Sequence, residues 1–463
     1  MISEIEIENF RSIRSDKISL ENITVLVGAN GSGKSNLVKA LDFLSAIPES
    51  GLDLAVSKQG GRDAITPKSI PIPKIKDSPT RFKYTVRLPT PHSKFVEGLQ
   101  YVEADHEFEL TFRTSRKTAL TRESLTFHKV LYVGEVLSDE NEALKISPES
   151  PLHFSNESTF TVKRDGKKTN YVIDPPLDES MLNSYVNWLG LDSFSEKITS
   201  PKELIDFLPN LGLRGSSSRK QKLTMRENES LIDPRARTSL DFSPNFFVFL
   251  QTIVSTKRYD LLLNELRRDQ SPSDSSELTS AGANMPAVLR KIRSKSRQFQ
   301  RLKSSLETIA PHIENLKSSS LRTGKEFVEF IEAKGGRGIE SWESSDGSLR
   351  ALAILVALET ARNDTTIIIE EPEQNLHPWA IHTLIDHMRE IVKERNIQLI
   401  LTTHSEHVLD RVEPSEVRVV SRDSDTGTHF LRLNQIIPDG NIDMGDVGRM
   451  WVKGILGGVP SFS

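Results

Sequence analysis

The sequence predicts an α/β fold that carries an antiparallel β-lobe and a compact helical insertion. Residues 23–27 form an apolar run that is followed by a glycine-rich loop and the start of a helix. Residues 366–369 and 397–403 are two further apolar runs, separated by a segment with helical periodicity. In the middle of the chain, several segments alternate apolar and polar residues, which is typical of antiparallel strands. Strands in both settings, joined by helices, indicate the α/β class.

Composition excludes several classes of protein. The chain has 463 residues, which allows roughly two or three domains, and its 36% hydrophobic and 27% charged residues suit a soluble globular protein. No apolar run approaches the roughly 18 residues that a membrane helix needs. Residues 1–6 alternate like a strand and do not resemble a signal peptide. The absence of cysteine excludes disulfides and fits a reducing cytoplasm, and the net charge of −4 gives no overall attraction to nucleic acid.

Residues 28–35 read Gly-Ala-Asn-Gly-Ser-Gly-Lys-Ser, a complete phosphate-binding loop between a predicted strand and a predicted helix. Glycines let successive N–H groups point at phosphate oxygens, and the helix start adds partial positive charge. A lysine here can reach the β- and γ-phosphates, and a serine can offer its hydroxyl to Mg²⁺. We therefore expect a nucleoside triphosphate and Mg²⁺ as ligands. The nucleotide-binding residues that the motif predicts are Gly28, Asn30, Gly31, Gly33, Lys34, Ser35 and Asn36.

Two adjacent carboxylates, Glu370 and Glu371, end the apolar run at 366–369. In phosphate-loop ATPases the first acid at this place holds Mg²⁺, and the second orients and deprotonates the attacking water. We assign Glu370, with Ser35, to the metal and Glu371 to the water. The alternative is a charged strand end without chemistry. His404 ends the next apolar run, where a side chain can contact the γ-phosphate and the attacking water, although a single histidine is often structural.

Residues 344–350 read Ser-Ser-Asp-Gly-Ser-Leu-Arg and precede an apolar helix. Ser345 and Gly347 can start that helix, which leaves free N–H groups and a positive dipole end that suit a γ-phosphate. The alternative is an ordinary N-cap.

Together these motifs resemble the ABC-type phosphate-loop ATPase heads of the RecF, SMC and OLD group, in small bacterial forms. The resemblance also rests on Ile-Glu-Asn-Phe-Arg-Ser-Ile at 7–13, Leu-His-Pro at 376–378, Thr-Thr-His-Ser at 402–405 and the tail at 451–460. It covers about the first 65 and the last 140 residues. Two positions depart from the usual pattern of such heads, because Glu370 stands where most have Asp and Asp346 stands where transporters have Gly.

The resemblance implies that two heads pair, with each ATP between one phosphate loop and the partner's Ser345–Gly347 signature. Binding of ATP would close the pair and hydrolysis would open it. Gln59 is a candidate for the loop that senses the γ-phosphate, and a plain surface turn is the alternative. Arg11 is a candidate nucleotide contact, and a solvated strand-end arginine is the alternative.

The stretch between Lys34 and Glu370 is longer than a bare head needs, and it lacks the heptads of an SMC coiled coil. We expect strands near 82–88, 106–112, 124–127, 160–162 and 171–173, then a helix near 246–253, a second at 285–309 and a strand at 326–332. The predicted ranges are an N-terminal lobe at 1–65, a β-rich part at 66–240, a helical arm or lid at 241–320 and a C-terminal lobe at 321–463.

Two stretches are basic. One, Arg214 with the cations of 215–226, is rich in serine, and the other lies along the helix expected at 285–309. The second holds Arg290, Lys291, Arg293, Lys295, Arg297, Arg301 and Lys303 with no acid among them. It could follow a DNA backbone. The alternatives are a solvated helix face or a surface for a partner protein.

The leading hypothesis is a cytoplasmic ATPase that forms a homodimer of heads on ATP and drives a separate effector protein in phage defence or DNA repair. Too few residues follow His404 for the nuclease domain of OLD proteins, so a nuclease would be a separate chain. The alternatives are a RecF-like protein that clamps DNA and a nucleotide-gated scaffold with little turnover.

Overall fold

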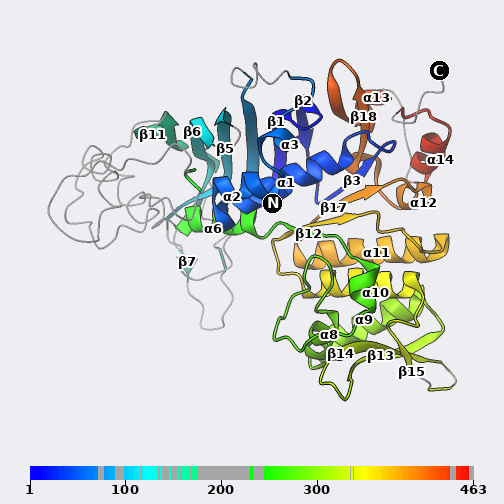
Figure 1. The fold of residues 1–463 in the computed structure, drawn as a ribbon. Coiled ribbons are helices and arrows are strands. Elements are labelled where there is room, and N and C mark those ends of the chain that lie inside the picture. The colour runs from blue at the N-terminus through cyan, green and yellow to red at the C-terminus, as the bar shows by residue number, and fades with distance from the viewer. Residues whose placement is uncertain are drawn as a thin grey trace. The chain divides into compact units, whose positions relative to one another are not determined.

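Figure 1 shows the computed structural model of the chain. It describes residues 1–70, 78–88, 98–114, 117–133, 136–137, 145–146, 154–155, 159–165, 168–174, 230–232, 244–333, 335–336, 338–437 and 445–457. The basic segment at 215–226 lies outside these residues. The chain forms two compact units, Met1–Ser19 with Lys39–Ser255, and Leu20–Val38 with Thr256–Ser463. The four ranges expected from the sequence stay a prediction.

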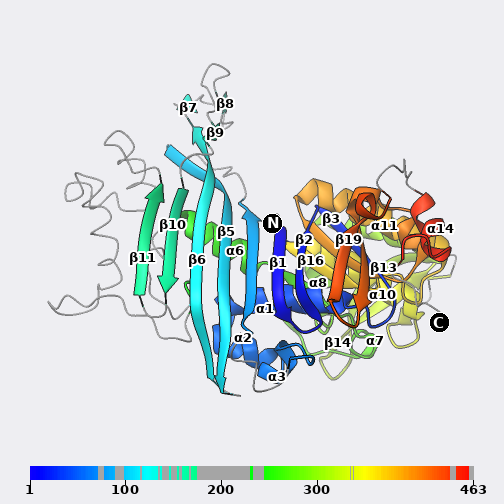
Figure 2. The same ribbon diagram turned by 90° about the horizontal axis from the view of Figure 1, so that it is seen from above.

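The first unit is built on an antiparallel sheet with the strand order β11-β10-β6-β5-β4-β1-β2 (Figure 2). Its strands are β1 (Ile2–Phe10), β2 (Ile13–Ser19), β4 (Thr80–Arg87), β5 (Gly98–Thr114), β6 (Lys117–Val133), β10 (Thr159–Asp165) and β11 (Lys168–Asp174). Short strands β7 (Val136–Leu137) and β8 (Lys145–Ile146) pair with each other, and β9 (Phe154–Ser155) pairs with β6. The five strands expected in this region are confirmed, and they form the antiparallel β-lobe.

Alternation explains why these segments form strands. Along β4 every second residue from Thr80 to Val86 is buried, so one face of the sheet is apolar. Phe82 stacks on Phe108 of the neighbouring strand at 5.2 Å between ring centroids, and both contact Phe43 of helix α1. The helices described in this unit are α2 (Leu52–Lys58), α3 (Arg62–Ile65), α6 (Pro244–Val254) and the part of α1 (Lys34–Ser50) from Lys39 onward.

The second unit contains the sheet that carries the predicted motifs. Strands β12, β16, β17, β3 and β18 lie in that order and are parallel, and β19 is antiparallel to β18. Their bounds are β3 (Ile23–Val27), β12 (Lys257–Tyr259), β16 (Thr366–Glu370), β17 (Gln398–Thr403), β18 (Val417–Asp423) and β19 (Gly427–Arg432). Every residue of β3 and β17 is buried, as expected for strands covered on both faces.

Helices cover this sheet, and α9, α10 and α11 lie side by side in Figure 1. The helices of the unit are α7 (Leu263–Arg267), α8 (Met285–Arg293), α9 (Ser296–Ile309), α10 (Asp346–Thr360), α11 (Pro378–Arg395), α12 (Glu406–Leu409), α13 (Leu433–Ile436) and α14 (Asp446–Val452), with a 3₁₀ turn at Pro414–Glu416. Residues 347–359 of α10 are all buried, which explains why its sequence is apolar on every side.

The helix expected at 285–309 is two helices, α8 and α9. Lys295 has φ −101° and ψ 83°, outside the helical region, and the Ser294 hydroxyl donates to the Lys291 carbonyl at 2.7 Å. This local hydrogen bond competes with the helical one and ends α8. Leu302 and Leu306 are fully buried, and α9 packs on α10 and α11. The two helices therefore form a layer of the unit's core.

A small antiparallel sheet completes the unit. It consists of β13 (Ile313–Ser320), β14 (Glu326–Glu332) and β15 (Gly338–Glu340). The strand expected at 326–332 is β14, and it belongs to this sheet. Among the described residues, none of the helices has the length and apolar character that crossing a membrane requires.

Candidate functional site

The phosphate loop joins β3 to α1 in the second unit. Gly31 and Gly33 have φ values of 78° and 115°, in the left-handed region that favours glycine. A Cβ atom at Gly33 would lie 2.3 Å from Thr428 Oγ1, and one at Gly28 would lie 2.2 Å from the Val420 carbonyl oxygen. Because β18 and β19 lie this close to the loop at Gly28 and Gly33, only glycine fits at these two positions. Gly31, by contrast, has open space around it, at the exposed tip of the loop beside Asn30.

Lys34 is folded back onto the loop and is only 7% exposed. Its Nζ donates to the carbonyl oxygens of Gly28 at 2.7 Å and Ala29 at 3.1 Å. Burial lowers the pKa of Lys34 to about 8, although Glu371, Glu373 and Glu370 act in the opposite direction. A partly dehydrated ammonium group therefore lies under the loop, where a phosphate would provide the negative charge that it lacks.

Ser35 and Glu370 meet at the edge of the sheet. The Ser35 hydroxyl donates to Glu370 Oε2 at 3.0 Å, although the two residues are far apart in sequence. They meet because β3 and β16 both flank β17 and run parallel to it, so their carboxyl ends reach the same edge. A hydroxyl and a carboxylate side by side supply the hard oxygen ligands that Mg²⁺ prefers. The residues present therefore fit the predicted metal.

Glu370 has a second partner that the sequence did not reveal. Arg258, on β12, places Nε at 2.8 Å and Nη2 at 2.7 Å from Glu370 Oε1. One oxygen of the carboxylate thus faces the phosphate loop while the other is held by a guanidinium group. No motif surrounds Arg258, so sequence reasoning had no signal for it.

Glu371 lies next to the loop with an unusual backbone. Its φ is 47°, a left-handed conformation that is unfavourable for a residue with a side chain. Its N–H donates to the Thr402 carbonyl at 2.9 Å, which ties it to β17. Its carboxylate accepts from the Gln374 side chain and lies 3.9 Å from His404 Nε2. Burial and then Lys34 lower the pKa of His404, while Glu371 raises it, so a neutral imidazole faces the carboxylate at neutral pH.

Glu373 is a third acid at this edge and was not predicted. Its Oε1 accepts from the Thr403 hydroxyl at 2.6 Å and from the His404 N–H at 3.1 Å. Burial, the largest cause, raises the pKa of Glu373. The side chain fixes the backbone that carries His404. The signal for it in the sequence was its place two residues after the paired acids.

Arg350 links α10 to the acidic strand, and it too was missed. Its Nη2 donates to the carbonyl oxygens of Glu370 and Glu371, both at 3.0 Å, and its Nη1 donates to the Leu261 carbonyl at 3.3 Å. It is 7% exposed, and burial lowers its pKa. An arginine inside an otherwise apolar helix was the available signal, since such a group is buried only with hydrogen-bond partners.

The signature residues have roles inside their own chain. Ser345 caps α10 by accepting from the Ser348 N–H at 3.2 Å, and it is exposed. Gly347 is buried, and a Cβ atom there would lie 2.4 Å from the Asn375 carbonyl oxygen. Arg267 donates to the Ser344 carbonyl at 3.1 Å and pairs with Asp346. The N-cap interpretation thus holds within the chain, and the exposed helix start stays available to a second molecule.

Three other predicted residues make local contacts within the chain. Asn36 donates its N–H to the Gly33 carbonyl at 2.9 Å, in the first turn after the loop. In the first unit, Arg11 Nη2 donates to the backbone oxygen of Gln59 at 2.9 Å and to its Oε1 at 3.0 Å. Burial lowers the pKa of Arg11. Arg11 and Gln59 therefore hold each other, and their proposed contacts with nucleotide stay predictions.

Most of the basic stretch on α8 and α9 is paired with acids. Arg290 pairs with Glu326, Arg301 with Glu359 and Glu394, and Lys303 with Glu307 at 3.3 Å. Lys291 lies 4.0 Å from Asp274. Arg293, Lys295 and Arg297 are exposed and lack such partners among the described residues. Of the seven cations in this basic stretch, three thus have no acidic partner among the described residues.

Comparisons with known proteins fit this geometry. Residues 1–86 match the family model described as "AAA ATPase domain", and residues 229–410 match the model described as "AAA domain, putative AbiEii toxin, Type IV TA system". No curated protein matches the sequence significantly.

Among solved structures, an Smc head bound to the C-winged helix domain of ScpA has a TM-score of 0.40 at 12% identity, over 94% of this chain and 99% of the other. The SMC head domain from Thermotoga maritima gives 0.37 at 11% identity, over 93% and 98%. An Smc head with an extended coiled coil, bound to the C-terminal domain of ScpA derived from Pyrococcus furiosus, gives 0.38 at 12%, over 94% and 98%.

The phosphate loop, the paired acids and the terminal histidine lie at the ends of three adjacent parallel strands, and the two ATPase models cover the segments that carry most of them. The chain therefore carries AAA-family ATPase domains, matched over residues 1–86 and 229–410.

Proposed function

We propose that the second unit binds ATP with Mg²⁺ and hydrolyses it. The observation that carries this proposal is the convergence of the phosphate loop and the acidic strand, with Ser35 Oγ 3.0 Å from Glu370 Oε2. Beside them, His404 Nε2 and Glu371 Oε1 lie 3.9 Å apart, which is too long for a hydrogen bond. The two side chains can therefore rotate toward a substrate. Sites of this kind act by positioning the triphosphate and by stabilising charge on its oxygens.

Each residue has a definite task in this proposal. Lys34 turns from the carbonyl oxygens of Gly28 and Ala29 to the β- and γ-phosphates. Glu371 accepts a proton from the attacking water, and neutral His404 donates a hydrogen bond to the γ-phosphate. Ser35 and Glu370 would hold Mg²⁺, which would supply positive charge to the phosphate oxygens. The left-handed backbone of Glu371 supports a functional role, because strain of this kind is retained mainly at functional sites.

We further propose that ATP joins two heads. The N-terminus of α10 supports this proposal, because Ser345 is exposed and the helix dipole there favours a phosphate group. The phosphate loop of one chain would then hold the triphosphate, and the Ser345–Gly347 signature of a second chain would complete the binding site. The closed and open pairs would differ in their contacts with an effector, which is how hydrolysis would act on a partner protein.

Exchange of Ser345 for aspartate tests this pairing. Aspartate is as good an N-cap as serine, so α10 keeps its start, but the added negative charge repels a partner's γ-phosphate. We expect Ser345→Asp to keep its unfolding midpoint and its affinity for ATP as a monomer, and to lose ATP-driven dimerisation in sedimentation velocity. The neutral cap Ser345→Asn is the matched control and should still dimerise. Dimers of Ser345→Asp as stable as the wild type would refute the assignment.

A role in phage defence or DNA repair, through a separate effector, is the biological setting that we propose. The model matched by residues 229–410 names a toxin of a type IV toxin–antitoxin system, which favours conflict with phage or plasmids. A DNA clamp is the alternative, and three exposed cations on α8 and α9 are its remaining support. Turnover that rises with duplex DNA would favour the clamp. ATP binding and dimerisation without turnover would favour a nucleotide-gated scaffold.

A further inference from the structure

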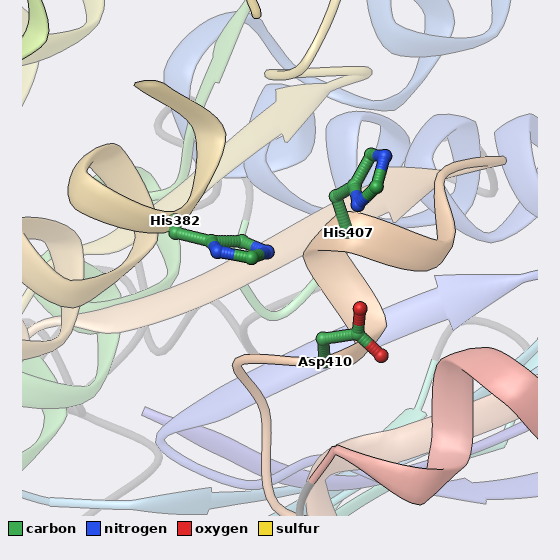
Figure 3. Close-up of side chains that lie close together, drawn as sticks. All are labelled: His382, His407 and Asp410. Carbon is green, nitrogen blue, oxygen red and sulfur yellow. The ribbon is translucent and has the colours of Figure 1, made fainter. Parts of the chain in front are cut away.

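A cluster of two histidines and an aspartate lies beside the strand end that carries His404. Figure 3 shows the ring of His382 extending from α11 toward α12, where His407 and Asp410 are located. The rings of the two histidines are 5.8 Å apart between centroids and inclined by 70°. One nitrogen of each histidine and one oxygen of Asp410 lie within 4.8 Å of one another. We propose that His382, His407 and Asp410 bind a divalent transition-metal ion of the zinc class.

Donor chemistry supports this choice of ion. Imidazole nitrogens suit Zn²⁺, Co²⁺ and Ni²⁺, whereas Mg²⁺ and Ca²⁺ require oxygen ligands. A tetrahedral Zn²⁺ ion with ligands at about 2.0–2.2 Å needs ligand atoms about 3.3 Å apart. The three side chains are half-buried, and their ligand atoms would have to approach one another by at most roughly 1.5 Å. Three protein ligands leave a position for water, so such an ion would exchange.

Potential ligand atoms without hydrogen-bond partners give a second, independent argument for a metal site. Nε2 of His382 is buried and has no hydrogen-bond partner among the described residues. A buried polar atom without a partner is unfavourable, and a metal would satisfy it. The Asp410 carboxylate likewise accepts no hydrogen bond from the described residues.

The surroundings contain charges of both signs. Arg411 Nη2 lies 3.5 Å from His382 Nδ1, and binding a metal through Nε2 places a proton on Nδ1, which opposes that contact. Arg411 has a second partner in Asp386, at 3.5 Å, to which it can turn. Helix α14 packs on α12 near Asp410. Gly448 of α14 leaves room for the Asp410 side chain, because a Cβ atom at Gly448 would lie 2.3 Å from Asp410 Oδ1.

The proposed metal site lies close to His404, so a bound ion would affect the segment that follows this residue. Helix α12 begins two residues after His404, and Ser405 between them caps it by accepting from the His407 N–H at 3.2 Å. A metal ion that joins His382 to His407 and Asp410 fastens α12 to α11. It thereby fixes the segment that follows the candidate catalytic histidine. Metal binding itself does not depend on ATP hydrolysis, so it can be tested without nucleotide.

The test uses the full chain without an affinity tag, stripped of metal, in excess Mg²⁺ and without nucleotide. Titration with Co²⁺, followed by calorimetry and by the visible spectrum of the bound ion, should give one ion per chain with nitrogen ligands. We expect His382→Ala, His407→Ala and Asp410→Asn each to lower the affinity at least about tenfold. His312→Ala is the matched control, because His312 is exposed in the turn between α9 and β13, and it should bind as the wild type does.

A stability readout accompanies the titration. Zn²⁺ should raise the unfolding midpoint of the wild type and of His312→Ala, because an ion that binds only the folded state stabilises it. It should leave the midpoints of the three ligand variants unchanged. The midpoint of each variant without metal shows that it folds, and any one of the three suffices for the comparison. Equal affinity in the wild type and all folded ligand variants, or failure of the wild type to bind one ion, would overturn the proposal.

Discussion

Glu371→Gln is expected to lower the rate of ATP hydrolysis about 10²–10⁴-fold, the range that a general base contributes. Glutamine has the shape of glutamate but cannot accept the proton of the attacking water. ATP binding should persist, because the phosphate loop is unchanged and the backbone hydrogen bond from residue 371 to Thr402 remains. Since the triphosphate is then bound but not cleaved, the variant should accumulate as an ATP-bound dimer. Phosphate release and sedimentation velocity on the same preparation measure both effects.

The control for this variant is Glu390→Gln on α11. The Glu390 side chain is 79% exposed, so its charge is screened by water and takes no part in the site. It should hydrolyse ATP at the wild-type rate. A Glu371→Gln variant that also turns over normally would show that another group activates the water, and the assignment of Glu371 would be wrong.

Lys34→Ala is expected to abolish measurable ATP binding while leaving the fold intact. The variant removes the one side chain of the loop that carries positive charge to the phosphates. The buried ammonium group also has a pKa lowered to about 8, so the folded state binds this proton less strongly than the unfolded state does. Its charge therefore destabilises the free protein below about pH 8 and is relieved above that pH. Removal of Lys34 should accordingly leave the unfolding midpoint within about 4 °C of the wild type.

Calorimetry with a non-hydrolysable ATP analogue measures the binding, and thermal unfolding without nucleotide measures the fold. Lys393→Ala, at an exposed position on α11, is the matched control and should bind the analogue normally. If Lys34→Ala binds the analogue with wild-type affinity, the nucleotide site lies elsewhere in the chain.

Much of this site could be predicted because its residues follow the ends of apolar strands. Residues 23–27, 366–370 and 398–403 are strands, and their parallel arrangement brings Lys34, Glu370 and His404 to one edge of the sheet. Because each motif follows a parallel strand, the order of motifs along the chain was enough to predict that they meet in space. The antiparallel β-lobe was equally predictable, because alternation in β4, β5 and β6 reports directly on one buried face.

The residues that the sequence did not reveal act through tertiary contacts. Arg258 reaches the acidic strand from β12 and belongs to no recognisable pattern, whereas Arg350 reaches it from α10 and ends the 344–350 motif, which gave it no role. The break between α8 and α9 depends on a side chain, Ser294, that ends a helix by a local hydrogen bond while the apolar periodicity continues. The pairing of Arg301 with Glu359 likewise joins two helices that are distant in sequence. Periodicity predicts which face is buried but not which charges meet.

The central claim is that one complete site needs the phosphate loop of one chain and the signature of another. Mixing Lys34→Ala with Ser345→Asp tests it, because each variant alone has no complete site, while a mixed pair has one. Equal amounts should give up to about half of the wild-type rate of ATP hydrolysis, since only mixed pairs form with ATP and each has one of two sites. A mixture as inactive as its two components would contradict the claim, as would full activity of Ser345→Asp alone.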